Sequence, residues 1–162
     1  MRSLSISWQD PHALAEAGRS LSGLEFLQAL VAGRLPPPPI AELLGFRLAE
    51  VASGHAVFEC TPGEQHYNPI GVVHGGLAMT LLDSAMGCAV QSRLPAGVGY
   101  TTLEAKTNLV RAITAGTGPL RAIGRVLHGG SRIATAEGRL EDRDGKLYAH
   151  ATTTCIVLQN GK

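Results

Sequence analysis

Residues 74–91 carry a nearly unbroken run of small and apolar side chains, and this run limits what the chain can fold into more than any other feature. The turn-forming residues Pro95 and Gly97 follow it, so it predicts a helix over about residues 75–92. A helix that is apolar on nearly every side needs cover, and a curved sheet is the obvious cover. The run contains one charge, Asp83. Because a buried, unpaired carboxylate is costly, Asp83 is either partnered or retained for chemistry.

Segments on both sides of this helix alternate as strands do. Before it, residues 46–52 and 55–61 flank a Ser53-Gly54 turn. After it, the turns AGTGP, HGGS and DRDG separate four further segments, namely 99–113, 120–127, 132–140 and 146–158. Short turns favour an antiparallel meander of these four strands. The predicted class is α+β, with a long central helix wrapped by a curved antiparallel sheet.

The N-terminal region is predicted to be a separate helical extension. Residues 11–35 show helical spacing of leucines, and the helix is expected to end at Gly33 and at the prolines 36–39. The proline run predicts a stiff polyproline-II connector. At 162 residues the chain is long enough for one domain. We therefore expect an extension and connector over residues 1–39 and one domain over residues 40–162.

The tripeptide His-Gly-Gly occurs twice, at residues 74–76 and 128–130. The second copy lies between two predicted strands and is expected to form a hairpin turn. The first copy opens the predicted helix, where backbone N–H groups lack intrahelical partners and the helix dipole is positive. A glycine there lets a ligand oxygen approach the backbone closely, so an oxyanion is the natural guest.

The pattern N-P-x-G-x-x-H-G-G-x-x-x-x-L-x-D-x-A-x-G, from Asn68 to Gly87, resembles the signature of hotdog-fold acyl-CoA thioesterases. The most similar branch is the phenylacetic-acid-degradation (PaaI-like) type. The stretches TLEAKTNLVRAI (102–113) and GKLYAHATTTCIVL (145–158) resemble that branch as well. The resemblance covers about residues 40–158 and leaves the N-terminal helix and the proline run outside.

This resemblance implies hydrolysis of an acyl-CoA thioester in sites shared across a homodimer, with a dimer of dimers as the expected assembly. Gly75 would give its N–H to the thioester oxygen, and Asp83 would act as general base or nucleophile. Asn68 would orient the water or the thioester. The chemistry is reasonable in itself, because a thioester carbonyl needs only an oxyanion site, an oriented water and one base.

A hydroxyl residue beside the acid is a further implication of the resemblance. Thr102 matches a strand position at which related enzymes place one, and Thr101 is its rival. Another branch carries a threonine four residues after the helix acid, whereas this chain has Gly87 there, so that helper is absent.

Several candidate site residues have a simpler structural interpretation. His74 is a candidate for catalysis, but it could instead hold the loop through a side-chain hydrogen bond. Asn68 could be only a turn residue before Pro69. Candidates for binding the substrate and the CoA phosphates are Gly76, Arg111, Arg125 and Arg132, and each arginine could be an ordinary surface charge.

Charge and composition exclude several other classes. Fourteen basic and thirteen acidic residues give a net charge of +1, which does not suggest a nucleic-acid binder. The three cysteines lack metal-site spacing, and no metal or cofactor is expected. Acidic residues near the N-terminus and the absence of a long apolar run predict a cytoplasmic protein with no membrane partner. No G-x-S-x-G elbow, P-loop or intact G-x-G-x-x-G is present.

Two rival functions remain open at this point. The first is a hotdog protein that binds acyl-CoA without hydrolysing it, which the presence of Asp83 disfavours. The second is a hotdog hydratase or dehydratase. Those enzymes share a different arrangement of histidine and acid, which this sequence does not show. The identity of the acyl group does not follow from the sequence.

Overall fold

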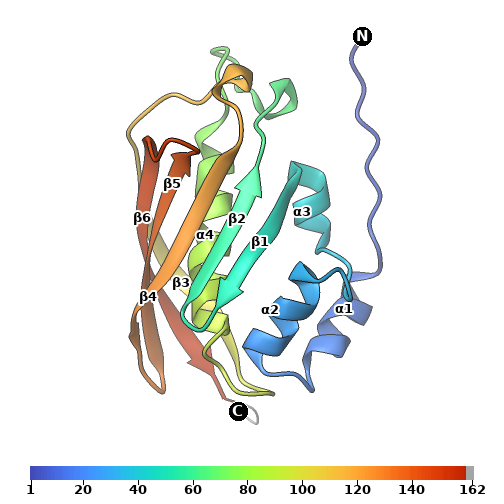
Figure 1. Cartoon of the computed structure of the whole chain (residues 1–162), viewed down its shortest axis with the longest axis vertical. Coiled ribbons are helices and arrows are strands. Elements are labelled where there is room, and N and C mark those ends of the chain that lie inside the picture. The colour runs from blue at the N-terminus through green and yellow to red at the C-terminus, as the bar shows by residue number, and fades with distance from the viewer. Residues whose placement is uncertain (160–162) are drawn as a thin grey trace.

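One long helix, α4 (Gly75–Gln91), runs along a curved six-stranded sheet in the computed structural model, which describes residues 1–159 (Figure 1). The strands lie in the order β1-β2-β4-β5-β6-β3, and all neighbours are antiparallel. Their bounds are β1 Phe46–Ala52, β2 His55–Cys60, β3 Gly99–Leu109, β4 Leu120–Gly129, β5 Ile133–Asp142 and β6 Leu147–Leu158. The predicted α+β class, with a helix wrapped by an antiparallel sheet, is confirmed. No helix within the described residues is long and apolar enough to cross a bilayer.

The predicted four-strand meander is wrong in the position of its first strand. Strands β4, β5 and β6 pair in succession, but β3 pairs with β6 and forms one edge of the sheet. The connection from β3 to β4 spans residues 110–119, includes the 3-10 turn Ala115–Thr117, and is too long for a tight hairpin. It runs past the start of α4, where the Ile113 carbonyl accepts from the Val73 N–H at 2.9 Å.

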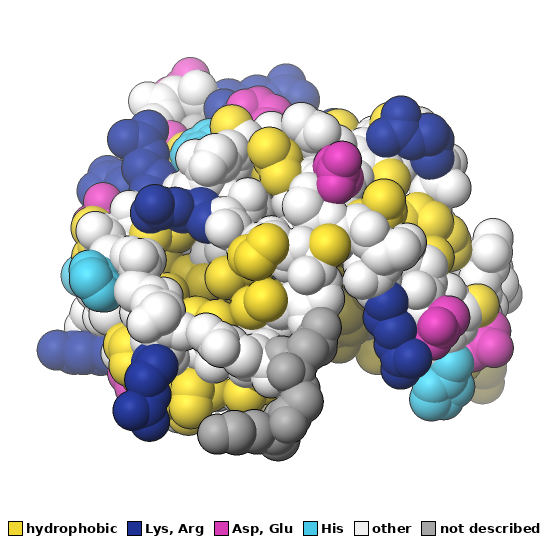
Figure 2. Space-filling view, turned by 90° about the horizontal axis from the view of Figure 1, so that it is seen from below, with side chains coloured by type: hydrophobic (Ala, Val, Ile, Leu, Met, Phe, Trp, Pro, Cys, Tyr) yellow, Lys and Arg dark blue, Asp and Glu magenta, His cyan; other side chains and the backbone are white. Residues whose placement is uncertain are grey.

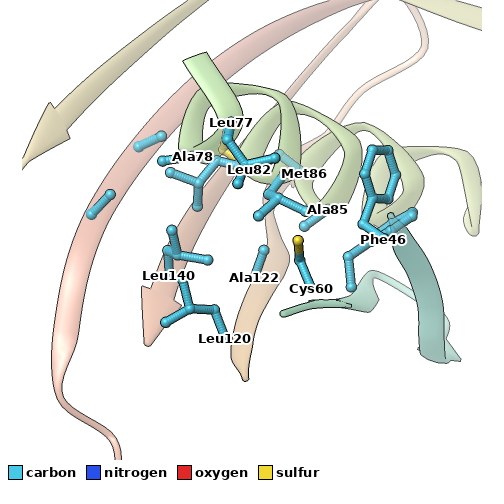
Figure 3. Packing of buried hydrophobic residues seen from close by; sticks show 14 of the residues in the cluster. Phe46, Cys60, Leu77, Ala78, Leu82, Ala85, Met86, Leu120, Ala122 and Leu140 are labelled. Atoms are coloured by element: carbon cyan, nitrogen blue, oxygen red, sulfur yellow. The ribbon is translucent and has the colours of Figure 1, made fainter. Parts of the chain in front are cut away.

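The buried sides of α4 form the core against the inner face of the sheet. Leu82 and Met86 are fully buried, as are the sheet residues Leu120, Ala122 and Leu140. Figure 3 shows these side chains meeting between the helix and the strands. Burial of this apolar surface is the main favourable term holding α4 in the curve of the sheet.

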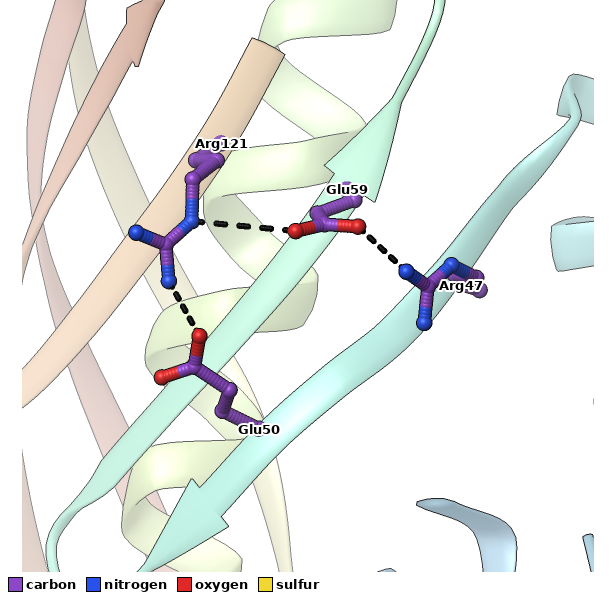
Figure 4. Close-up of polar contacts among 4 residues, drawn as sticks. All are labelled: Arg47, Glu50, Glu59 and Arg121. Carbon is purple, nitrogen blue, oxygen red and sulfur yellow. Dashed lines mark hydrogen bonds and ion pairs between the residues drawn. The ribbon is translucent and has the colours of Figure 1, made fainter. Parts of the chain in front are cut away.

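The outer side of the sheet carries charged residues in pairs across strands. Figure 4 shows Arg121 on β4 joined to Glu50 on β1 and to Glu59 on β2, and Glu59 joined to Arg47. These groups are partly exposed, so each pair contributes little to stability. The two arginines and two glutamates balance one another, so these charges need no ligand to neutralise them.

The N-terminal region contains two helices where the leucine spacing predicts one. Helix α1 spans Pro11–Gly18 and α2 spans Gly23–Val31. Ser22 starts α2 through a capping box: its hydroxyl accepts from the Glu25 N–H at 3.3 Å, and the Glu25 carboxylate accepts from the Ser22 N–H at 2.9 Å. The expected proline connector is also shorter, because Pro39 begins a third helix, α3 (Pro39–Leu44).

Helix α2 is attached to the C-terminal end of α4 by a close backbone contact. The Gly23 N–H donates to the Leu94 carbonyl at 3.0 Å. A Cβ atom at residue 23 would lie 1.8 Å from the Gln91 carbonyl oxygen, which belongs to the backbone and cannot turn away. Only glycine therefore allows this approach.

Gly23→Ala is expected to lower the free energy of unfolding by about 1–3 kcal/mol, since α2 must move off α4 to accommodate the methyl group. Chemical denaturation of both proteins measures the difference. Gly116→Ala is the matched control, because the nearest atom to a Cβ at residue 116 is 3.7 Å away. Equal stability of the two variants would show that the contact at Gly23 adapts without loss.

Candidate active site

The start of α4 presents one free and one occupied backbone N–H. His74 is the N-cap, and its Nδ1 accepts from the Gly76 N–H at 2.8 Å. The Gly75 N–H has no hydrogen-bond acceptor within residues 1–159, and Gly75 is partly exposed. Of the two glycines predicted to meet the substrate, Gly75 thus offers its N–H at the positive end of the helix dipole, while that of Gly76 is occupied.

Asn68 shapes the loop that leads into α4. Its side-chain oxygen accepts from the N–H groups of Ile70 and Val72 at 3.1 and 3.4 Å. The same oxygen therefore cannot easily face a ligand, and the amide NH₂ is the part left for one. The side-chain oxygen of Asn68 thus has the structural role of a turn residue. The predicted contact with water or thioester would use the side-chain nitrogen.

His66 supports this loop and was missed by the sequence reasoning. Its carbonyl accepts from the His74 N–H at 2.8 Å. Its Nδ1 accepts from the Gly63 N–H at 3.0 Å, so in the neutral ring Nε2 carries the proton and donates to the Leu44 carbonyl at 3.1 Å. The buried ring thus joins α3 to the segment before α4. No spacing in the sequence links His66 to His74.

Asp83 is partnered by Thr102. The Thr102 Oγ1 donates to Asp83 Oδ1 at 2.9 Å, which fixes one carboxylate oxygen and leaves Oδ2 for another donor. Thr101, the rival candidate, is exposed and next to it on β3, so alternation along the strand directs it to the other face. Asp83 itself is exposed in the single chain, so the expectation that it lies in a buried part of the helix is wrong.

Tyr100 fills the space above Gly87. The sequence alone does not indicate that these two residues are in contact. A Cβ at residue 87 would lie 2.4 Å from the Tyr100 hydroxyl oxygen, so a larger residue four positions after Asp83 has no room. Burial raises the pKa of Tyr100 well above its ordinary value, and the nearby Cys88, Cys155 and Asp83 raise it further. The tyrosine therefore stays a neutral hydroxyl beside the carboxylate.

Cys88 is the thiol near Asp83, and its environment does not activate it. Burial, followed by the negative charge of Asp83, raises the pKa of the Cys88 thiol to about 12. Burial likewise raises the pKa of Cys60 to about 11. Since the thiolate is the reactive form, neither cysteine is a ready nucleophile at neutral pH.

The two halves of the candidate site do not meet within one chain. Gly75 and Asp83 are separated by eight residues of α4, which corresponds to about 12 Å along the axis. The side of α4 that carries Asp83 also carries Met79, which is 47% exposed. On the neighbouring edge strand β3, Leu109 lies beside the start of α4, because the end of its side chain would be 2.4 Å from a Cβ at residue 75, and it is 49% exposed. This exposed surface, consisting of Met79, Asp83 and Leu109, is called the α4–β3 face below.

The three candidate arginines lie at opposite ends of the molecule. Arg111 is near the start of α4, where its Nε donates to the Leu147 carbonyl at 3.3 Å and its guanidinium lies 5.9 Å from the Tyr148 ring centre. Arg125 and Arg132 flank the β4–β5 turn, near the other end of α4. Figure 2, viewed from below, shows basic side chains spread around an apolar centre. The three arginines therefore do not form one cluster in a single chain.

No group of three or more His, Cys, Asp and Glu side chains within residues 1–159 is arranged to hold a metal ion. The candidate site consists instead of a carboxylate, a hydroxyl that bonds to it, and a free helix N–H. Such groups can accept a proton and bind an oxyanion.

Comparison with known proteins identifies relatives for most of the chain. A family model described as the thioesterase superfamily matches residues 70–149. A phenylacetic acid degradation-related protein of Ralstonia eutropha, described as a candidate thioesterase, is 30% identical over 80% of this chain and 98% of its own, with a TM-score of 0.72. The phenylacetic acid degradation protein PaaI of Thermus thermophilus is 28% identical over 73% and 97%, with a TM-score of 0.66. A Saccharolobus solfataricus protein named as a candidate esterase is 31% identical over 120 residues, which are 74% of this chain and 84% of its own length.

Proposed function

Because this chain belongs to the thioesterase superfamily and has the hotdog fold of its PaaI-like members, we propose that it hydrolyses an acyl-CoA thioester to a free carboxylic acid and CoA. The observation that carries the proposal is the hydrogen bond from Thr102 to Asp83 at 2.9 Å. It holds a carboxylate in a fixed orientation on an exposed helix surface, where a substrate and a water molecule can reach it.

Asp83 acts as the general base in this proposal. Thr102 occupies Oδ1, so Oδ2 accepts a proton from a water molecule while the water oxygen attacks the thioester carbonyl carbon. The carbonyl oxygen becomes an oxyanion and is stabilised by the Gly75 N–H and the positive end of the α4 dipole. When the intermediate collapses, the carbon–sulfur bond breaks, and the CoA sulfur leaves as a thiol with the proton that Asp83 had accepted. A direct attack by Asp83, with an anhydride as intermediate, is the alternative course that the same geometry allows.

Each site is shared by two chains in the proposed assembly. The Gly75 N–H and the Asp83 carboxylate must both lie within about 3 Å of groups at one carbonyl centre, and about 12 Å of helix separates them. Two antiparallel copies of α4, related by a twofold axis, bring the start of each helix beside the middle of the other. The exposed α4–β3 face supports this, because it places apolar side chains and an open sheet edge around Asp83.

The reaction is tested by thiol release from acyl-CoAs with short, long and aromatic acyl groups. We expect steady release of CoA from at least one of these classes, at a rate proportional to protein concentration. The acyl-CoA-binding alternative predicts tight binding without release, and the hydratase alternative predicts addition of water to an enoyl-CoA with the thioester intact. Either of these results would contradict the proposed hydrolysis.

A further inference from the structure

An apolar cavity lies between the N-terminal helices and the first two strands. Its volume is about 490 Å³, which is in the range of pockets that hold small organic ligands. The apolar side chains that line it include Leu14, Phe26, Leu27, Leu30, Leu48 and Phe58. The α2 side chains among them come from the extension that lies outside the matched family region, residues 70–149.

The cavity has few polar groups, and its one charge is already paired. Among the described residues, Gln9, Arg47 and Gln91 bring the long polar side chains to its lining, and Arg47 forms an ion pair with Glu59. A ligand with a charged or strongly polar group inside the cavity would therefore lack a partner for it. The lining suits a hydrocarbon chain whose polar end stays outside.

The cavity lies beside α4, partway around the helix from the candidate active site. Cys88 lines the cavity and follows Asp83 by five residues, which is about 7.5 Å along the helix axis and about 140° around it. Tyr100 lies over Gly87, between these two positions. The electrostatic effects support the proximity of these three residues, since Asp83 raises the pKa of Cys88 and both residues raise the pKa of Tyr100.

We propose that this cavity receives the hydrocarbon chain of the acyl group, so that the N-terminal extension selects linear alkyl acyl-CoAs of medium or greater length. The inference rests on the proposed hydrolysis at Asp83. The thioester would lie at Asp83 and the chain would follow α4 past Tyr100 and Cys88 into the space under α2. Because residues 1–159 bring no unpaired charge into the cavity, the chain enters by its methyl end, and the CoA moiety remains at the surface.

The test measures binding of S-alkyl-CoA thioethers, which have no carbonyl carbon to attack, from ethyl to dodecyl by calorimetry. In the unmodified protein, each added methylene from about butyl to decyl is expected to strengthen binding about three- to fourfold, as burial of a methylene predicts. Leu30→Trp fills the cavity from α2, so the ratio of dodecyl to butyl affinity should fall tenfold or more. Gln28→Trp is the matched control, because Gln28 is exposed on the same helix and outside the cavity lining.

The outcomes separate this inference from the proposed function. Affinity that does not change with chain length overturns the inference, and this result needs no variant to fold. Equal effects of Leu30→Trp and Gln28→Trp also overturn it, because the chain then lies elsewhere. Hydrolysis of butyryl-CoA, decanoyl-CoA and an aromatic acyl-CoA by the same preparation is measured in parallel. Hydrolysis with a flat thioether series contradicts the cavity alone, whereas length-dependent binding without hydrolysis of any acyl-CoA contradicts the thioesterase proposal.

Discussion

Replacing Asp83 with asparagine is expected to lower the turnover number by about 10²–10⁴-fold and to leave acyl-CoA affinity nearly unchanged. The amide keeps the size of the carboxylate, and its oxygen can still accept from Thr102, whose hydroxyl now lies 2.9 Å from Asp83 Oδ1. What is lost is a group that can take a proton from water. Because residue 83 is exposed in the single chain, the change should have little effect on its folding.

The measurement combines thiol release under saturating acyl-CoA with calorimetric binding of a thioether analogue. Asp144→Asn is the control, since it removes the same charge from an exposed position in the β5–β6 turn. It should have the turnover number of the unmodified protein. If Asp83→Asn also retained full turnover, Asp83 would have no part in the proton transfer, and the mechanism proposed for this site would be wrong.

The helices and strands of this fold follow from the sequence more directly than the contacts between them. The bounds expected for the long helix, about 75–92, agree with α4, because the apolar run and the turn formers after it are local signals. The pairing of β3 with β6 is not local, and the spacing of residues does not reveal it. The break between α1 and α2 does have a local signal in the sequence. Ser22 and Glu25 form a capping-box pattern, which the helical spacing of the leucines obscured.

The candidate site shows the same division between local and distant contacts. The motif predicted Gly75 and Asp83 as a functional pair, and Thr102 as the hydroxyl partner of the acid came from the resemblance. The sequence did not reveal that Asp83 is exposed, because apolar neighbours on a helix say nothing about which side the sheet covers. Tyr100 was missed for a similar reason, since only the packing of β3 on α4 places its hydroxyl over Gly87.

Gly75→Val is expected to lower turnover by about 10²–10³-fold, as the loss of an oxyanion donor does in other acyl-transfer enzymes. A side chain at residue 75 crowds the approach of the thioester oxygen to the N–H. Its Cβ would also lie 2.4 Å from the end of the Leu109 side chain, which is about half exposed and can turn aside. A thermal unfolding curve close to that of the unmodified protein should accompany the loss. Full activity of Gly75→Val would show that the thioester oxygen binds elsewhere.

Mixing this variant with Asp83→Asn should then restore activity, if each site takes Gly75 from one chain and Asp83 from its partner. In a mixed dimer, one site combines an unmodified Gly75 with an unmodified Asp83, and the other carries both changes. Random 1:1 pairing makes half of the dimers mixed, each with one good site of two, so about a quarter of the original activity should return.

Two differently tagged variants are refolded together, and native mass spectrometry establishes the fraction of mixed dimers. A site built within one chain predicts no recovery at all, because every chain in the mixture carries one of the two defects. Mixed dimers as inactive as their parents would therefore rule out the shared site, whereas recovery in proportion to their fraction would assign Gly75 and Asp83 of each site to different chains.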